Sequence, residues 1–111
     1  MTVITTLDIK DMQAGEYRAV LDHMGVETRP AGGIYLHLTT PMSFGYRIVE
    51  LWDRKEGFEE FLEKRLVPAT QELGIEPETE ISITPLHNLF ASRLQEIPGL
   101  TAGLPGAPGA R

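Results

Sequence analysis

Apolar and polar positions follow two different periods along the first 90 residues. Four short runs rich in β-branched and aromatic residues predict strands over 3–9, 34–40, 46–52 and 79–86. Between these runs, apolar residues recur at the three- and four-residue spacings of one helix face. The two helical sets comprise Tyr17, Val20, Leu21 and Met24, and then Phe58, Phe61, Leu62 and Leu66. The pattern therefore predicts the order β-α-β-β-α-β.

Residues with strong local preferences predict where the helices begin and end. Asp11 is expected to cap the first helix, and Gly25 to end it in the left-handed conformation. Asp53 and Glu56 have the spacing of a capping box at the start of the second helix. Pro68 is expected to kink or restart that helix, because its ring clashes with the carbonyl four residues back.

The order of elements predicts the fold. Pro41 is expected to stop the second strand, and the short link to the third strand predicts an antiparallel hairpin. Right-handed crossovers then give an α+β, ferredoxin-like βαββαβ fold, with an antiparallel four-stranded sheet and both helices on one face. The strand over 46–52 is apolar on both faces, so both should be covered. A second copy of the sheet is the simplest cover, which predicts a homodimer.

The end of the chain differs in kind from the rest. We expect a domain over 1–90 and a C-terminal extension over 91–111, which from about residue 98 is rich in Pro and Gly. Such a segment buries little surface to offset its ordering entropy, so it is expected to be a flexible tail. The alternative is an arm that lies on a partner subunit through Leu100 and Leu104.

Composition narrows the class of protein. The 111 residues include no cysteine, which excludes disulfides and thiolate metal sites, and the net charge of −6 argues against a nucleic-acid binder. No apolar run is long enough to span a membrane. The first six residues lack the features of a signal peptide, so a cytoplasmic location is expected.

The three histidines of the chain are considered first as candidates for acid–base chemistry. His37 shares its predicted strand face with Tyr35, so the two either contact a partner subunit or line a pocket in which His37 is a general acid or base. His87 and Asn88 follow the last strand, where they could hold an oxyanion or simply fix the strand end. His23 is expected to be exposed on the first helix.

Glu50 lies between apolar neighbours on a face that is expected to be buried. A carboxyl group there must be paired or protonated, and it could serve as a general acid or base. Pairing with Arg47 or Arg65 is the structural alternative. A metal site built from Glu50, His37 and His87 is conceivable, but their spacing does not support one, and no nucleotide or flavin motif is present. We therefore expect no metal and no cofactor.

Aromatic residues cluster near the third strand and the second helix. Tyr46 and Trp52 share a strand face, and Phe58 and Phe61 lie on the helix that follows. Together they could line a substrate-binding pocket for a flat, apolar ligand, or they could form a plain hydrophobic core.

The segment over 46–58 is similar to a known family. The strand that ends in Trp52, followed by Asp53, Glu56 and Phe58, resembles the antibiotic-biosynthesis-monooxygenase-like (ABM-like) family of the dimeric α+β barrel superfamily. The segments over 61–69 and 85–88 resemble one small branch of that group. The resemblance covers about residues 2–90 and implies a pocket in each subunit between the sheet and the helices, near Trp52.

The resemblance also implies a class of function. It points to a cofactor-independent, monooxygenase-like enzyme of polyketide or antibiotic metabolism that acts on a small hydrophobic substrate. Relatives that cyclise or isomerise small molecules by acid–base chemistry are one alternative, and a non-catalytic ligand-binding or stress-response module is another. Heme-degrading relatives carry a histidine ligand on the second helix. Residues 58–67 contain no histidine, so heme binding of that kind is not expected.

Overall fold

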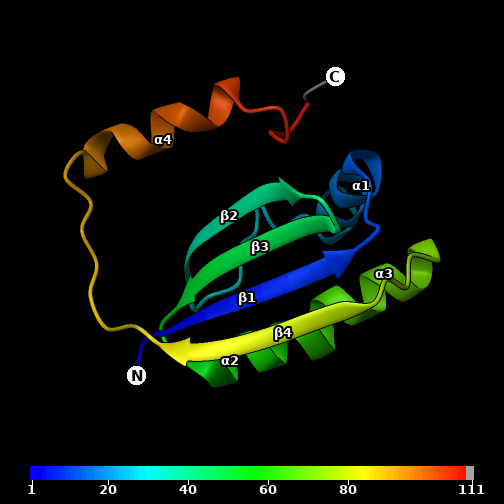
Figure 1. Ribbon diagram of the computed structural model, residues 1–111, viewed down its shortest axis with the longest axis horizontal. Helices are drawn as coiled ribbons and strands as arrows, with labels where there is room; N and C mark the ends of the chain where they lie inside the picture. Colours follow the sequence, from blue (N-terminus) through cyan, green and yellow to red (C-terminus); the bar gives the residue numbers. More distant parts are fainter. Residues whose placement is uncertain (110–111) are drawn as a thin grey trace.

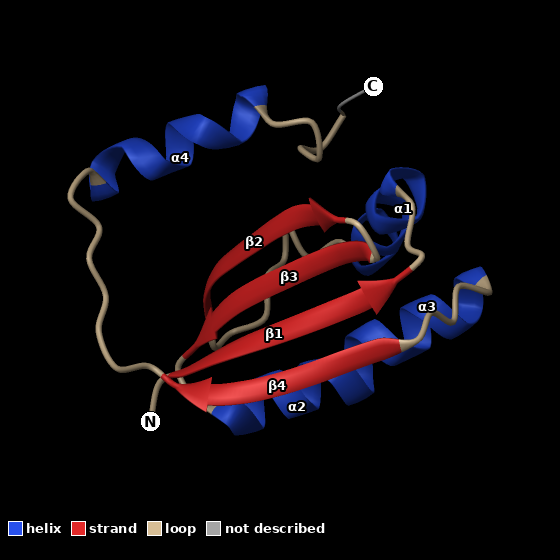
Figure 2. Ribbon diagram, viewed as in Figure 1, coloured by secondary structure: helices blue, strands red, loops and turns tan. Residues whose placement is uncertain are grey.

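The computed structural model describes residues 1–109, and its core is a single antiparallel sheet backed by helices (Figure 1). The strands are β1 (Val3–Lys10), β2 (Ile34–Met42), β3 (Gly45–Trp52) and β4 (Thr79–Pro85), and they lie in the order β2-β3-β1-β4. Helices α1 (Ala14–Met24), α2 (Lys55–Phe61) and α3 (Val67–Leu73) cover one face of this sheet (Figure 2). The predicted α+β ferredoxin-like fold is confirmed.

Strand register divides the sheet into an inner face, which meets the helices, and an outer face. In β1, buried and half-buried residues alternate without interruption. Leu7 of β1 lies opposite Ile48 of β3, and Val3 lies opposite Trp52, so these buried side chains share the inner face. Trp52 also packs edge-to-face on Phe58 of α2, with ring centroids 5.8 Å apart, and both are fully buried. The core therefore sits between the sheet and the helices.

Two predicted helix caps are wrong. The N-cap of α1 is Gln13, whose backbone N–H donates to the Glu16 carboxylate at 2.9 Å, whereas Asp11 adopts a left-handed φ of 58° in the preceding turn. Helix α2 begins after Arg54 without a side-chain cap. Asp53 instead packs against Gly33, where an added Cβ would come within 2.6 Å of its Oδ1 atom. Tertiary contact to this loop thus replaces the local capping box.

Proline has different effects at its two predicted break points. Pro41 does not stop β2, which continues to Met42, because β2 is an edge strand and a missing N–H on the free edge costs no ladder bond. Pro68 does restart the helix, as predicted. A π-helical turn, η1 (Leu62–Leu66), precedes it, and the Val67 N–H donates to the Leu62 carbonyl five residues back. This wider turn relieves the clash of the proline ring.

The chain after β4 leaves the sheet and arcs back towards α1 (Figure 1). It forms three short helical turns, η2 (Leu94–Glu96), α4 (Ile97–Leu100) and η3 (Thr101–Gly103). Apolar side chains of this segment, among them Phe90 and Leu100, are exposed. The division at residue 90 and the flexible tail remain predictions, and residues 110–111 of that tail lie outside the described residues. Within residues 1–109, no helix is long and apolar enough to cross a membrane.

Candidate active site

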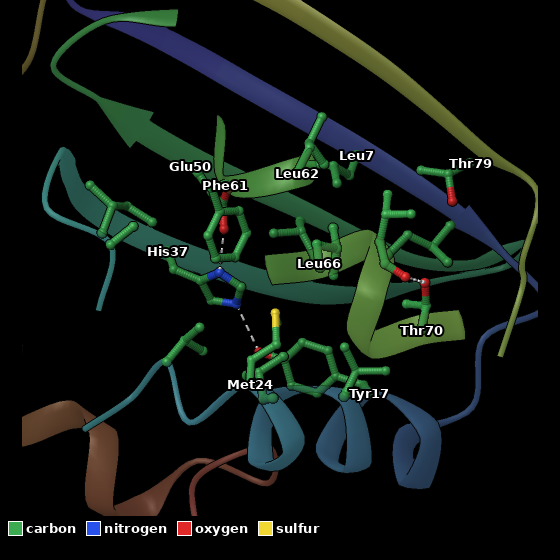
Figure 3. Close-up of a pocket in the computed structure, with 18 of the residues that line it drawn as sticks. Leu7, Tyr17, Met24, His37, Glu50, Phe61, Leu62, Leu66, Thr70 and Thr79 are labelled. Atoms are coloured by element: carbon green, nitrogen blue, oxygen red, sulfur yellow. Dashed lines mark hydrogen bonds and ion pairs between the residues drawn. The ribbon is translucent and has the colours of Figure 1, made fainter. Parts of the chain in front are cut away.

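A cavity of about 820 Å³ lies between the inner face of the sheet and the helices (Figure 3). Its walls are mainly apolar side chains from β1, β3, α1 and η1, including Leu7, Ile48, Leu21, Met24, Leu62 and Leu66. A cavity of this size and character is typical of a site for a small organic molecule. The π-helical turn contributes directly, because both of its terminal leucines line the cavity.

A histidine–carboxylate pair forms the polar part of the cavity wall. His37 of β2 and Glu50 of β3 are opposite each other in the strand register, and His37 Nδ1 lies 2.7 Å from Glu50 Oε2. Trp52 Nε1–H donates to the other oxygen of Glu50 at 3.1 Å. A carboxylate can only accept, so Glu50 in that form fixes His37 with its proton on Nδ1. The Nε2 atom is then left as an acceptor on the cavity side.

Tyr17 of α1 completes a hydrogen-bonded chain across the cavity wall. Its Oη atom lies 2.8 Å from His37 Nε2 and accepts from the Thr39 hydroxyl at 2.9 Å. Figure 3 shows His37 between Glu50 and Tyr17, which approach it from the sheet and from α1. Tyr17 is itself buried, and its ring stacks on Tyr46 at 5.9 Å. The sequence Glu50–His37–Tyr17 is therefore a continuous path for a proton.

Burial also determines the protonation state of Tyr17. Desolvation raises the pKa of its phenol above the ordinary value near 10, and the nearby Glu27 carboxylate acts in the same direction. The hydrogen bond from Thr39 opposes this shift but does not cancel it. At neutral pH Tyr17 is thus a phenol that donates its proton to His37 Nε2, and it is not a tyrosinate base.

The alternative in which Glu50 pairs with Arg47 or Arg65 is wrong. Arg47 points to the outer face of the sheet and binds Asp8 there, with Nε 2.7 Å from Oδ1. Arg65 donates to the Met24 carbonyl at the end of α1, at 3.0 Å. Neither guanidinium reaches Glu50, whose partners are His37 and Trp52.

A register shift in β2 separates Tyr35 from His37, which were expected to share a face. The shift lies between Ile34 and Leu36, so Tyr35 is the extra residue of the bulge and is 65% exposed at the cavity rim. Ile34, expected on the opposite face from His37, packs instead against the inner core. His37 keeps the inner face, because its Cα partner is Glu50.

The other predicted site residues fall into three groups. Phe61 lines the cavity, and Tyr46 supports it from behind by stacking on Tyr17. Trp52 and Phe58 belong to the closed core, although Trp52 also contacts Phe61, with ring centroids 5.6 Å apart. His87 and Asn88 are exposed on the segment after β4 and do not line the cavity. The structure therefore brings together Glu50, His37 and Phe61, and leaves the His87–Asn88 pair elsewhere.

Two members of the hydrogen-bonded chain were not identified as site residues from the sequence. Tyr17 was assigned only to the apolar face of the first helix, and Thr39 only to a strand face. The signal for Tyr17 is that a buried tyrosine hydroxyl normally requires a polar partner, in a helix face that is otherwise aliphatic. In the part of the chain that the structure describes, no group of three or more His, Asp or Glu side chains could hold a metal ion.

Solved structures with this fold come from several organisms. A variant of SnoaB, a cofactor-independent oxygenase from Streptomyces nogalater, has a TM-score of 0.59 at 12% identity, covering 82% of this chain and 97% of its own. A conserved protein from Methanosarcina mazei Go1 has a TM-score of 0.58 at 14% identity, covering 78% and 95%. A proposed antibiotic biosynthesis monooxygenase from Deinococcus radiodurans has a TM-score of 0.55 at 19% identity, covering 82% and 97%.

These likenesses confirm the ABM-like resemblance at the level of the fold. Identities of 12–19% do not carry an activity from those proteins to this chain. No family model and no curated protein matches the sequence. The function must therefore be argued from the residues of the cavity.

Proposed function

We propose that this protein is a cofactor-independent enzyme, monooxygenase-like, that acts on a small hydrophobic molecule of the polyketide type inside the cavity. The observation that carries the proposal is the Glu50–His37–Tyr17 chain in the wall of a cavity that is otherwise apolar. The shared fold of a cofactor-independent oxygenase supports it. Glu50 and His37 are the proposed catalytic residues, and Phe61 is proposed to contact the substrate.

The proposed first step removes a proton from the substrate. Glu50 holds the Nδ1–H of His37, so Nε2 can accept a proton from a phenol or enol that takes the place of Tyr17 as donor. The resulting anion is electron-rich enough to react with O₂. In a balanced monooxygenation, one oxygen atom replaces the two hydrogens of a CH₂ group and the other leaves as water. The Glu50 carboxylate stabilises the imidazolium formed on the way.

The same proton transfer would serve a cyclase or an isomerase. An enolate formed beside His37 can attack a carbonyl group of its own molecule, and Tyr17 can return the proton. The hydrogen-bonded chain supports this second candidate as well, because a cyclase or isomerase needs acid–base chemistry alone. A module that only binds its ligand would need the cavity but not the chain.

Oxygen uptake with an anthrone-type phenol tests the proposal. We expect turnover by the wild type and a fall in kcat of roughly 10²–10⁴ in His37→Gln and Glu50→Gln, which remove the base and its partner. His23→Gln is the matched control, because His23 pairs with Glu72 on the surface of the helices. Full activity in both site variants would contradict the acid–base assignment.

Product analysis separates the candidate functions. A rearranged product without oxygen consumption identifies a cyclase or isomerase, whereas binding without any product identifies a ligand-binding module. A Soret band on mixing with hemin that is lost in His37→Gln would identify a heme-handling protein and overturn the proposal.

We also propose that two copies associate through the outer face of the sheet. Half of that face is apolar, formed by Ile4, Leu36, Leu38, Val49 and Leu51 on three adjacent strands. Leu38 is 55% exposed there. The C-terminal segment, with Leu100 and Leu104 exposed, is a second candidate contact to the partner copy.

A further inference from the structure

The charged side chains that line the cavity are of one sign. Glu50 is part of the hydrogen-bonded chain, while Glu27, from the loop after α1, and Glu76, from the loop before β4, line the cavity as solvent-exposed residues. Among the described residues that line the cavity, none is a lysine or an arginine. A ligand in this cavity therefore meets three carboxylates and, among the described lining residues, no lysine or arginine.

Two arginines near the cavity, Arg18 and Arg65, are already engaged. Arg18 forms ion pairs with both Asp22 and Glu27, and its Nη1 donates to the Gly106 carbonyl at 2.7 Å. One positive charge shared by two carboxylates leaves this cluster negative. Arg65 donates to the carbonyl of Met24 and lies over the Phe61 ring, 5.9 Å from its centroid. Neither guanidinium is left to neutralise an anionic ligand.

We propose that the cavity selects uncharged apolar molecules and rejects those that carry a carboxylate, sulfonate or phosphate. This inference rests on the proposed function, since it names the substrate class of the same site. An anion that enters the cavity would lose its hydration without a lysine or arginine as counter-ion, in an apolar environment where repulsion from the carboxylates is weakly screened. A neutral substrate that gives its proton to His37 keeps the total charge of the site unchanged. A neutral hydroxyl or carbonyl avoids both costs and can hydrogen-bond to Tyr17 or Thr39.

This selection indicates what kind of reaction must supply the substrate. A polyketide-type precursor with a free carboxylate, or one still attached to a phosphate-bearing carrier, does not meet the condition. The reaction that supplies the substrate must therefore release it from its carrier and remove or mask its carboxylate, as a decarboxylation does. The molecule that reaches this site is a neutral phenol, enol or ketone.

Two fluorescent probes of nearly equal shape test the inference. N-phenyl-1-naphthylamine is neutral, and 1-anilinonaphthalene-8-sulfonate is the same ring system with a sulfonate. We expect the neutral probe to bind at least about tenfold more tightly, a difference of about 1.4 kcal/mol. Equal affinities, tighter binding of the sulfonate, or failure of the neutral probe to bind would each overturn the inference.

Charge variants test whether the carboxylates cause the preference for the neutral probe. In Glu27→Gln, which leaves Arg18 with Asp22 as its one remaining ion-pair partner, and in Glu76→Gln, we expect tighter binding of the sulfonate and little change for the neutral probe. Glu63→Gln is the matched control, because Glu63 is exposed and does not line the cavity. A selectivity ratio that stays the same in both Glu27→Gln and Glu76→Gln would show that the carboxylates do not cause it, and would overturn the inference.

A variant that fills the cavity verifies the binding site. Thr70→Trp adds a large ring to a residue that lines the cavity and should abolish binding of the neutral probe. Leu62→Trp, on the neighbouring turn, is the second variant if circular dichroism shows that the first does not fold. Persistent binding in a folded, filled variant would overturn the inference. Oxygen uptake is measured in parallel: equal probe affinities with His37-dependent turnover would refute the charge selection alone, whereas no turnover would refute the proposed function.

Discussion

Tyr17 connects the two layers of the protein at the candidate site. It comes from α1, yet its hydroxyl contacts two residues of β2, His37 and Thr39. Because burial raises the pKa of this phenol, Tyr17 holds a proton that it can donate, and its position depends on how the helix packs on the sheet. Any shift of α1 would therefore alter the acid–base geometry.

Tyr17 should make the protein less stable at high pH. Above about pH 10 a tyrosine in the unfolded chain loses its proton, while Tyr17 in the folded protein keeps it, so unfolding becomes more favourable as pH rises. We expect Tyr17→Phe to show a shallower loss of unfolding free energy between about pH 10 and 12. Urea titrations at several pH values, with absorbance at 295 nm to follow ionisation, measure this effect.

Thr39→Val provides the complementary test of Tyr17. The hydrogen bond from Thr39 lowers the pKa of the Tyr17 phenol, so its removal should move the ionisation of Tyr17 to still higher pH. A downward shift in this variant, or a titration at 295 nm that is the same in Tyr17→Phe as in the wild type, would contradict the assignment.

At the residue scale, the sequence identified the candidates but not their partners. Glu50 and His37 each stand out because a polar side chain occupies a buried or aromatic strand face. Their pairing depends on the register between β2 and β3, which is continuous from the turn at Met42 and Gly45 as far as Leu36 and Leu51, and the bulge at Tyr35 shifts only the pairing beyond that point. The contact with Tyr17 joins residues 20 positions apart through helix packing, which no local pattern encodes.

The β2–β3 hairpin depends on one glycine. Gly45 has a φ of 145°, and an added Cβ would lie 2.1 Å from the Ile9 carbonyl oxygen. We expect Gly45→Ala to destabilise the protein by more than about 1 kcal/mol, measured by urea unfolding. Gly15 is the control, because it lies in α1 with nothing within 4 Å of an added Cβ. Gly15→Ala should be neutral or stabilise by up to about 1 kcal/mol. Equal effects of the two variants would contradict this explanation.

At the scale of elements, glycine and proline predicted the ends of helices and strands correctly only where their effect is local. Gly25 ends α1 with a φ of 67°, as predicted, because a left-handed C-cap involves only its own turn. Pro68 predicted a break in the helix, but not the π-helical turn before it, whose first and last residues, Leu62 and Leu66, line the cavity. Pro41 misled because its effect depends on whether β2 is a central or an edge strand.

At the scale of the whole molecule, the two faces of the sheet differ in what covers them. The inner face is covered by helices, and the space they leave is the cavity. The outer face has an apolar half and a polar half, where Asp8 and Arg47 form an ion pair. The strand over 46–52, which is apolar on both sides, indicated that both faces of the sheet carry apolar surface. A pocket between the sheet and the helices was expected from the family resemblance alone, because a void is set by the packing of several elements and no local pattern encodes it.

The proposed dimer gives a direct test at this scale. Leu38 is a large, exposed apolar residue in the apolar half of the outer face, on the edge strand β2 and opposite Val49 on the neighbouring strand. In a face-to-face dimer, a carboxylate at this position would be buried without a partner, so Leu38→Glu should shift the protein from dimer to monomer. Leu73→Glu, on an exposed position of α3, should leave the assembly unchanged. Sedimentation velocity at micromolar concentration measures the assembly of both variants and of the wild type. A monomeric wild type would refute the dimer and would mean that the apolar half of the outer face is exposed to water in the native protein.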